Sequence, residues 1–329
     1  MGETAGAQAG RPSTCEWGHP FFLLLLLLSL SLALPAPSRS LSTILRAFAA
    51  KACIKSASMP TPEHEITGFE RTSLTFDVGP DVTKTRDVYL RGEGPAVIVM
   101  AEVPGITPEV TKLATAVADH GFAVYMPQLF GTPNRGYTTG ATLGTLARAC
   151  VSREFSLLAA DASSPIVDWL RALARHAHAE RGGPGVGAIG MCLTGNFALG
   201  MMLDTKVIAP VLSQPSLPVA LGARLSRGLH VSPEGMRGVH ERIRDDGAKV
   251  LGLRFHGDPM CPAARFERLR AELGDAFEGI EIDPKHARRG APKPAHSVLT
   301  VHLVDRPGEP TREALDRTLA FLTEQLRPS

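Results

Sequence analysis

From residue 72 onward, short β-rich segments alternate with longer amphipathic segments, and this alternation constrains the fold more than any other feature of the sequence. Two parallel strands need a long crossover connection, usually a helix, so the alternation predicts one mostly parallel sheet with helices on both faces. The predicted fold class is therefore α/β. The segments predicted to be strands of this sheet are residues 96–101, 123–126, 185–190, 207–212, 250–255 and 277–282.

An antiparallel hairpin is expected to precede the parallel part of the sheet. Two β-rich runs, residues 72–77 and 85–90, flank the turn residues Gly79, Pro80 and Asp81. The run that follows, residues 96–101, is continuously apolar, as expected for a strand covered on both faces. Helices are predicted over residues 107–120, from about 164 onward, over 262–273 and over 311–326.

The first 58 residues are interpreted as a leader, and residues 59–329 as one domain. Residues 21–34 contain only Phe, Leu, Ser and Ala, but a membrane-spanning helix needs about 20 apolar residues, so this segment has the length of a signal-peptide core. Residues 38–58 are rich in Ser and Ala, carry basic residues and lack acidic ones, like an organellar transit segment. A third interpretation places the functional start at Met59.

These alternatives lead to different locations. A start at Met59 predicts a cytoplasmic protein, whereas a working leader predicts a secreted or organellar one. Membrane contact is expected only if residues 21–34 are retained. The sequence leaves open whether the protein is a monomer or a homodimer.

Charge places limits on the partners of this chain. The sequence has 35 basic and 33 acidic residues, a formal net charge of +2. The leader holds five basic and two acidic residues, so the remaining 271 residues hold 30 basic and 31 acidic ones. A nearly neutral domain excludes a protein dominated by electrostatic capture of nucleic acid, and a small-molecule partner is expected instead.

The five cysteines do not form a recognisable framework. No two of them are spaced as a CxxC pair, so neither a structural zinc site nor a dithiol redox motif is indicated. Two lie in the leader, and Cys150 and Cys261 are interpreted as structural. Cys192 is the one expected to react.

Four polar residues follow predicted strands, where an open α/β sheet binds its ligands. Glu102 follows the first apolar strand, Cys192 follows the strand at 185–190, and Asp258 comes three residues after the strand at 250–255. His296 follows the last strand after a loop. A nucleophile, an acid and a base thus occur in that order along the chain.

The surroundings of Cys192 resemble a nucleophile elbow, a sharp turn between a strand and a helix. Such a turn needs small residues on both sides, which Gly190 and Gly195 provide, whereas Thr194 fits this requirement less well. The helix expected to begin near Thr194 would favour the Cys192 thiolate through its dipole and free N–H groups. The backbone N–H groups of Leu193 and Val103 are predicted to form an oxyanion hole.

Taken together, four short motifs resemble the dienelactone hydrolase family of α/β-hydrolases. They are Gly-Met-Cys-Leu at 190–193, Ala-Glu-Val-Pro-Gly at 101–105, His-Gly-Asp at 256–258 and Ala-His-Ser at 295–297. The resemblance covers roughly residues 72–326 and implies a triad of Cys192, Asp258 and His296. It also implies that Glu102 contacts the thiol and helps to deprotonate it when substrate binds. It also implies cleavage of an ester or lactone through a thioester, without a metal or organic cofactor.

The sequence departs from this family where the substrate is held. Members that act on dienelactone bind its carboxylate with arginines, one of them shortly after the catalytic histidine, but residues 297–300 here are Ser-Val-Leu-Thr. Arg153 is a candidate for another substrate-binding arginine. The resemblance therefore indicates the reaction class and leaves the substrate open.

Other interpretations of the same residues stay open at this stage. The same triad permits acyl transfer to an acceptor other than water, and a non-catalytic binding module on the same fold is a second alternative. Asp258 precedes Pro259 and could merely cap a turn. His256 and Cys261 lie near it in sequence, but their spacing matches no standard metal-ligand set.

Overall fold

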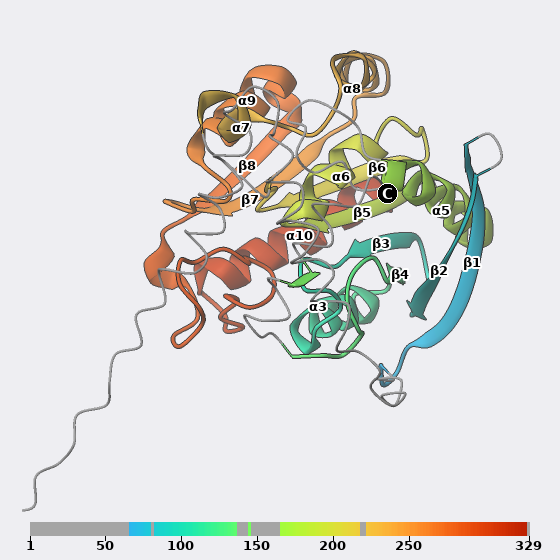
Figure 1. Cartoon of the computed structure of the whole chain (residues 1–329), viewed down its shortest axis with the longest axis horizontal. Helices are drawn as coiled ribbons and strands as arrows, with labels where there is room; N and C mark the ends of the chain where they lie inside the picture. Colours follow the sequence, from blue (N-terminus) through green and yellow to red (C-terminus); the bar gives the residue numbers. More distant parts are fainter. Residues whose placement is uncertain (1–65, 80–81, 137–143, 146–164, 218–221, 328–329) are drawn as a thin grey trace, which may run out of the picture. The chain divides into compact units, whose positions relative to one another are not determined.

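The described residues form one sheet of eight strands in the order β1-β2-β4-β3-β5-β6-β7-β8 (Figure 1). The structure is a computed structural model, and it describes residues 66–79, 82–136, 144–145, 165–217 and 222–327. The pairs β1 with β2 and β2 with β4 are antiparallel, and the other five pairs are parallel. The strands are β1 Glu70–Gly79, β2 Val82–Arg91, β3 Ala96–Met100, β4 Ala123–Pro127, β5 Val186–Met191, β6 Val207–Ser213, β7 Val250–Phe255 and β8 Phe277–Ile282.

The predicted hairpin and the predicted parallel strands are confirmed. In β1 the partly buried residues alternate with exposed ones, and Leu74, Phe76 and Val78 pack against the core. On its other face Thr75 and Thr85 share a hydrogen bond of 2.8 Å across the hairpin. This half-exposed pattern is what an antiparallel edge with one solvated face requires.

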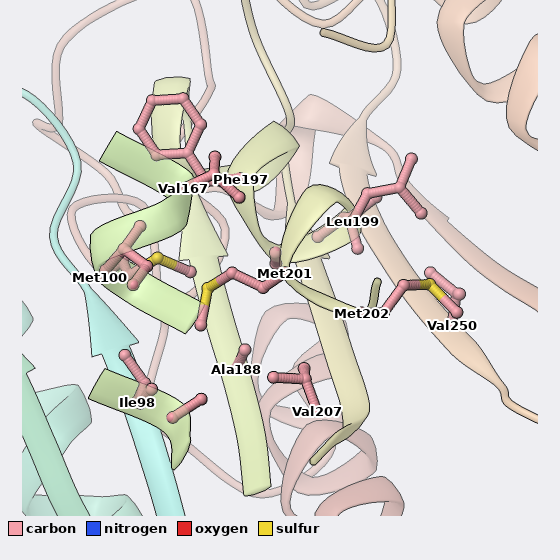
Figure 2. Packing of buried hydrophobic residues seen from close by; sticks show 14 of the residues in the cluster. Ile98, Met100, Val167, Ala188, Phe197, Leu199, Met201, Met202, Val207 and Val250 are labelled. Carbon is pink, nitrogen blue, oxygen red and sulfur yellow. The ribbon is translucent and has the colours of Figure 1, made fainter. Parts of the chain in front are cut away.

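Strand β3 shows why an unbroken apolar run belongs at the centre of the sheet. Its alternate residues contribute to two separate core clusters, Ile98 and Met100 to one and Val97 and Val99 to the other. The helices α5, α6, α8 and α9 contribute to the first cluster, part of which is drawn in Figure 2, and α3 and α10 to the second. Both faces of the sheet are therefore covered, and the predicted α/β class is confirmed.

The helices begin where local sequence favours them. Thr107 caps α3 by accepting a hydrogen bond from the Val110 N–H, and Pro108 occupies its first turn, where a missing N–H costs nothing. Gly121 follows this helix with a φ of +86°. The helices are α3 Pro108–Asp119, α5 Pro165–Arg181, α6 Leu193–Met201, α7 Gly222–Arg227, α8 Pro233–Asp246, α9 Ala263–Leu273 and α10 Pro310–Leu326, with 3-10 turns η1 Gly274–Ala276 and η2 Pro284–His286.

On the charged segment at the end of α8, Arg244, Asp245 and Asp246 are exposed, whereas Arg242 is buried. Arg242 lies on α8 with only 8% of its surface exposed, and its guanidinium forms an ion pair with Asp246 at 2.8 Å. It also donates to the Val207 carbonyl oxygen at 3.4 Å. The long apolar stem makes burial favourable, while the charged end keeps a carboxylate partner near the surface.

All of the described residues lie in one compact unit, Pro62–Ser329. Within them, no helix combines the length and apolar character that crossing a membrane requires. The leader interpreted at residues 1–58 lies outside the described residues, as does its apolar segment.

Candidate active site

Cys192 occupies a strained turn between β5 and α6. Its backbone has φ 57° and ψ −119°, and α6 begins at the next residue. A residue other than glycine in such a sparsely populated region costs of order 1–3 kcal/mol and is found mainly at functional sites. Cys192 is partly exposed, whereas Met191 and Leu193 on either side are buried. The turn therefore presents the thiol at the carboxyl edge of the sheet.

Two glycines allow this turn to form, as the sequence predicts. A Cβ atom at Gly190 would overlap the carbonyl oxygen of Thr194, and one at Gly195 would lie 2.8 Å from the Cα of Pro215. Both distances are shorter than real Cβ atoms tolerate. The absence of side chains at these positions lets strand, turn and helix approach closely.

The interpretation of Thr194 as a poorly fitting residue needs correction. Its side chain is fully buried, and its hydroxyl accepts a hydrogen bond from the Met191 N–H at 2.8 Å. The hydroxyl also lies within donating distance of the carbonyl oxygens of Met191, at 2.9 Å, and Met100, at 3.1 Å. Thr194 therefore ties the elbow to its own strand and to β3.

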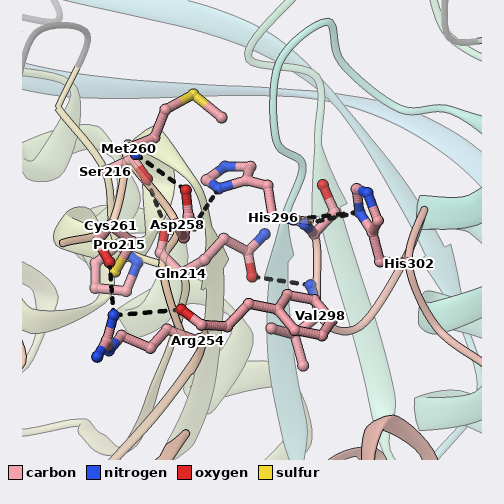
Figure 3. Close-up of polar contacts among 12 residues, drawn as sticks. Gln214, Pro215, Ser216, Arg254, Asp258, Met260, Cys261, His296, Val298 and His302 are labelled. Carbon is pink, nitrogen blue, oxygen red and sulfur yellow. Dashed lines mark hydrogen bonds and ion pairs between the residues drawn. The ribbon is translucent and has the colours of Figure 1, made fainter. Parts of the chain in front are cut away.

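His296 and Asp258 form a buried pair (Figure 3). The Nδ1 of His296 lies 2.6 Å from Oδ2 of Asp258. The other carboxylate oxygen of Asp258 accepts a hydrogen bond from the Met260 N–H at 2.9 Å, so this residue also stabilises the turn at Pro259. Asp258 thus caps its turn and contacts His296 at the same time, and its role in orienting a catalytic base stays a prediction.

Burial and charge act in opposite directions on this pair. Burial raises the pKa of Asp258, but the charge of His296 and hydrogen bonds from His296, Met260 and Cys261 outweigh it and leave the pKa below its ordinary value. Burial lowers the pKa of His296, but the charges of Asp258 and Cys192 outweigh it and leave the pKa well above its ordinary value. The site therefore favours an ionised Asp258 beside a protonated His296.

We expect the Asp258→Asn variant to be less stable than the wild type by about 1–3 kcal/mol, with a characteristic pH dependence. The stability from a lowered Asp pKa is present above the unfolded value of about 4 and is lost as pH falls through the folded value. The stability from a raised His pKa is complete below about 6.5 and is lost as pH rises through the folded value.

The difference in Tm between wild type and variant should therefore be largest between about pH 4 and pH 6.5. Thermal unfolding followed by circular dichroism across the pH range measures it. Asp245→Asn, which changes a fully exposed carboxylate paired with Arg244, should have little effect. A loss of Tm that is equal at all pH values would contradict the expected linkage.

The second ring nitrogen of His296, Nε2, is the one that does not contact Asp258. Nε2 is buried and has no partner at hydrogen-bond geometry within the described part of the chain, but Cys192 lies close enough to raise the pKa of the ring through its charge and a side-chain contact. A buried polar atom without a partner is costly and calls for a functional explanation. A ring fixed at Nδ1 and unpartnered at Nε2 can exchange a proton at one defined position.

Glu102 is buried and binds the segment that carries His296. Its Oε2 accepts hydrogen bonds from Ser297 Oγ at 2.7 Å and from Gln214 Nε2 at 3.2 Å, and its Oε1 accepts one from Thr300 Oγ1. The burial of this carboxylate is thus compensated by three donors. The predicted contact of Glu102 with the Cys192 thiol stays a prediction.

The predicted oxyanion-hole residues lie at the carboxyl ends of neighbouring strands. β3 and β5 pair in parallel, with Met100 opposite Gly190, so the chain that continues to Val103 and the chain that continues to Leu193 leave the same edge. Leu193 is the first residue of α6, where backbone N–H groups lack partners within the helix. Their role in binding an oxyanion stays a prediction.

Several residues around the site have positions that the sequence did not indicate. Ser297, Thr300 and Gln214 bind Glu102, and Gln214 Oε1 also accepts from the Val298 N–H at 3.3 Å. The only feature of the sequence that could have indicated them is their position: Gln214 directly follows a strand, and Ser297 and Thr300 follow His296. The predicted substrate-binding residue Arg153 lies outside the described residues.

The two side chains considered as metal ligands near Asp258, those of Cys261 and His256, have different surroundings. Cys261 is completely buried in a hydrophobic cluster, and burial raises the pKa of its thiol strongly. The Nδ1 of His256 lies 3.7 Å from a carboxylate oxygen of Glu281 instead. Within the described part of the chain, no three His, Cys, Asp or Glu residues are grouped as a metal site would need.

The strand order, the elbow after β5 and the order Cys, Asp, His along the chain define the α/β-hydrolase class. Within that class, residues 85–216 match the model of the dienelactone hydrolase family. The matched part contains two of the four motifs, those at residues 101–105 and 190–193, and agrees with the resemblance that they indicated.

Similar solved structures are described as a dienelactone hydrolase, a dienelactone hydrolase-like enzyme and an esterase. A candidate dienelactone hydrolase from Klebsiella pneumoniae is 16% identical, with a TM-score of 0.48, and the alignment covers 78% of this chain and 99% of that one. The dienelactone hydrolase-like promiscuous phosphotriesterase P91 from metagenomic libraries is 15% identical, with a TM-score of 0.48 and coverage of 79% and 99%.

Carboxyl esterase 2 from the fungus Tuber melanosporum is 14% identical, with a TM-score of 0.47 and coverage of 86% and 98%. No curated protein matches the sequence.

Proposed function

We propose that this protein is a cysteine-dependent hydrolase of small carboxylic esters or lactones. The observation that carries the proposal is the arrangement of three residues. Cys192 lies on a strained, partly exposed turn, and His296 contacts Asp258 at 2.6 Å through Nδ1, which leaves Nε2 for the thiol. A nucleophile, a base and a group that orients the base are the parts that acyl transfer requires.

In the proposed first step, the sulfur of Cys192 attacks the ester carbonyl carbon and its proton resides on Nε2 of His296. The raised pKa of His296 favours this imidazolium, and Asp258 compensates its charge. The carbonyl oxygen becomes negative and is stabilised by the N–H groups of Leu193 and Val103. Collapse of this intermediate breaks the ester C–O bond, and the leaving alkoxide takes the proton from Nε2.

In the second step, His296 removes a proton from water, and the resulting hydroxide attacks the thioester carbonyl carbon. The carbon–sulfur bond breaks, the carboxylic acid is released, and Cys192 recovers its proton. The same cycle opens a lactone, in which alcohol and acid remain one molecule.

Glu102 is assigned a supporting part in forming the thiolate. Three donors hold its carboxylate in the structure, two at Oε2 and one at Oε1. A carboxylate can accept about four hydrogen bonds, so one acceptor position on Oε1 is left for a contact with the thiol. The hydroxyls of Ser297 and Thr300 occupy the stretch after His296 where dienelactone-cleaving members have an arginine. This difference supports esters and lactones without a recognised carboxylate as the first substrates to test.

We expect the full chain to hydrolyse p-nitrophenyl acetate and simple lactones and to form a transient acyl-enzyme. Rapid acid quenching followed by intact mass and peptide mapping should place one acyl group on Cys192. Pretreatment with iodoacetamide near neutral pH should block both turnover and acylation.

Other outcomes separate the alternatives. A thiol unreactive to iodoacetamide, together with no ester turnover, would support a binding module and contradict the proposal. Acyl transfer to added thiols or amines that is faster than hydrolysis would identify the protein as an acyltransferase.

A further inference from the structure

His302 is a buried histidine that the proposed reaction does not use. It lies six residues after His296, and only 4% of its surface is exposed. Its ring packs edge-on against Phe255, with 5.9 Å between the ring centroids. A buried imidazole must satisfy two ring nitrogens, so its partners show what it does.

The partners of His302 lie at both ends of the segment that carries His296. Figure 3 shows His302 beside His296. Its Nδ1 faces two backbone N–H groups, that of Ser297 at 3.1 Å and that of His296 at 3.5 Å. Its Nε2 lies 2.7 Å from the carbonyl oxygen of Pro292. The N–H of His302 itself donates to the Ser297 carbonyl oxygen at 3.0 Å.

These partners determine the tautomer of the ring. Two N–H donors directed at Nδ1 require a lone pair there, so the single proton of the neutral imidazole lies on Nε2 and is donated to Pro292. A second proton, on Nδ1, would face the N–H group of Ser297 and lose that hydrogen bond. Only neutral His302 with its proton on Nε2 joins residue 292 to residues 296 and 297.

We propose that His302 is a positioning residue, which holds the backbone of His296 so that its ring lies between Asp258 and Cys192. Glu102 holds the same segment through the side chains of Ser297 and Thr300, whereas His302 holds its backbone. The two restraints are therefore complementary. This inference rests on the proposed function only for its kinetic consequence.

The electrostatic surroundings favour the neutral ring that this role needs. Burial is the largest influence and lowers the pKa of His302, and the positive charges of His296 and Arg288 act in the same direction. Two influences oppose it, the hydrogen bond to the Pro292 carbonyl and the charge of Asp258. Phe255, which packs against the ring, carries no charge.

Two substitutions test separately the contact of His302 with the Ser297 N–H and its contact with the Pro292 carbonyl oxygen. In His302→Asn the side-chain oxygen can replace Nδ1 as acceptor for Ser297 but does not reach Pro292. In His302→Gln the longer amide can donate to Pro292 but leaves the Ser297 N–H without an acceptor. Because a misplacement of about 1 Å can cost 10²-fold in rate, we expect kcat to fall about 10²-fold in His302→Gln and less in His302→Asn, with little change in KM.

A measurement that does not depend on activity accompanies the kinetics. The proton shared by His296 Nδ1 and Asp258 should give a strongly downfield proton NMR signal in the wild type, which should shift or broaden in His302→Gln. His240→Asn and His240→Gln are matched controls, since His240 is partly exposed on α8 and paired with Glu272. They should leave kcat and the signal unchanged.

The outcomes distinguish this inference from the proposed function. An unchanged downfield signal and unchanged kcat in folded His302→Gln would overturn the positioning role. A changed signal in a protein without esterase activity would support the positioning role and contradict the proposed function. Nitrogen-15 shifts of wild-type His302 add a test that needs no variant, because a proton on Nδ1 at neutral pH would also overturn the inference.

Discussion

Replacing Cys192 by alanine is expected to lower kcat/KM for p-nitrophenyl acetate by a factor of about 10⁴ to 10⁶, the range found when the nucleophile of a triad is removed. The substitution removes the sulfur and keeps the Cβ atom, so the strained backbone at φ 57° meets the same steric demands. Initial rates with the folded variant, and the absence of an acyl adduct by intact mass, measure the effect.

Cys261→Ala is the matched control for this variant. Cys261 is the other free cysteine among the described residues, but it is wholly buried in the core, where its raised pKa keeps it a thiol. We expect its activity to stay within about threefold of the wild type, with a modest loss of stability from the small cavity. Full activity in Cys192→Ala would contradict the proposed mechanism. Cys192→Ser should retain weak activity, because a hydroxyl needs a stronger base.

The sheet could be predicted from the sequence because its strands are covered on both faces. A run such as residues 96–100 has no polar side that another fold could use, and its residues indeed divide between the two core clusters. The antiparallel edge was equally readable, since Leu74, Phe76 and Val78 alternate with polar residues. In both strands the order of apolar and polar residues indicates directly which side chains are exposed to solvent.

Helix α8 could not be predicted in the same way, because its buried face is made partly of glycine. Gly235 and Gly238 approach the side chain of Leu203 closely, and a Cβ on Gly238 would lie 2.6 Å from it. Besides these, Met236, Val239 and Arg242 carry the buried face. A periodic apolar signal is weak when small and charged residues fill the contact.

The positions of Cys192, Asp258 and His296 after their strands could be predicted, but the contacts around them could not. Cys192, Asp258 and His296 each follow a strand or its loop, and topology alone brings such positions to one edge of the sheet. The contact of Gln214 with Glu102 joins residues 112 positions apart, and it depends on loop conformations that no local pattern specifies. Thr194 was misjudged for the same reason, since its acceptor at Met100 lies on another strand.

Gly190→Ala is expected to be the most destabilising single-methyl change at the elbow. The added Cβ would overlap the Thr194 carbonyl oxygen and lie 2.9 Å from the Cα of Gly195. Both are backbone atoms, and the Thr194 side chain ties that backbone to β3 and β5, so the clash cannot be relieved by turning a side chain. We expect a loss of about 3 kcal/mol or more in unfolding free energy, at the upper end for overpacking.

Urea unfolding measures this loss, and Gly136→Ala supplies the comparison for it. A Cβ on Gly136 meets no atom of the described residues within 4 Å, and its φ lies outside the left-handed region, so the same methyl group should change stability by less than about 0.5 kcal/mol. Gly190→Ala with wild-type stability would show that the elbow can open without cost. If it instead folds but forms the acyl-enzyme slowly, the added Cβ has displaced the turn that carries Cys192.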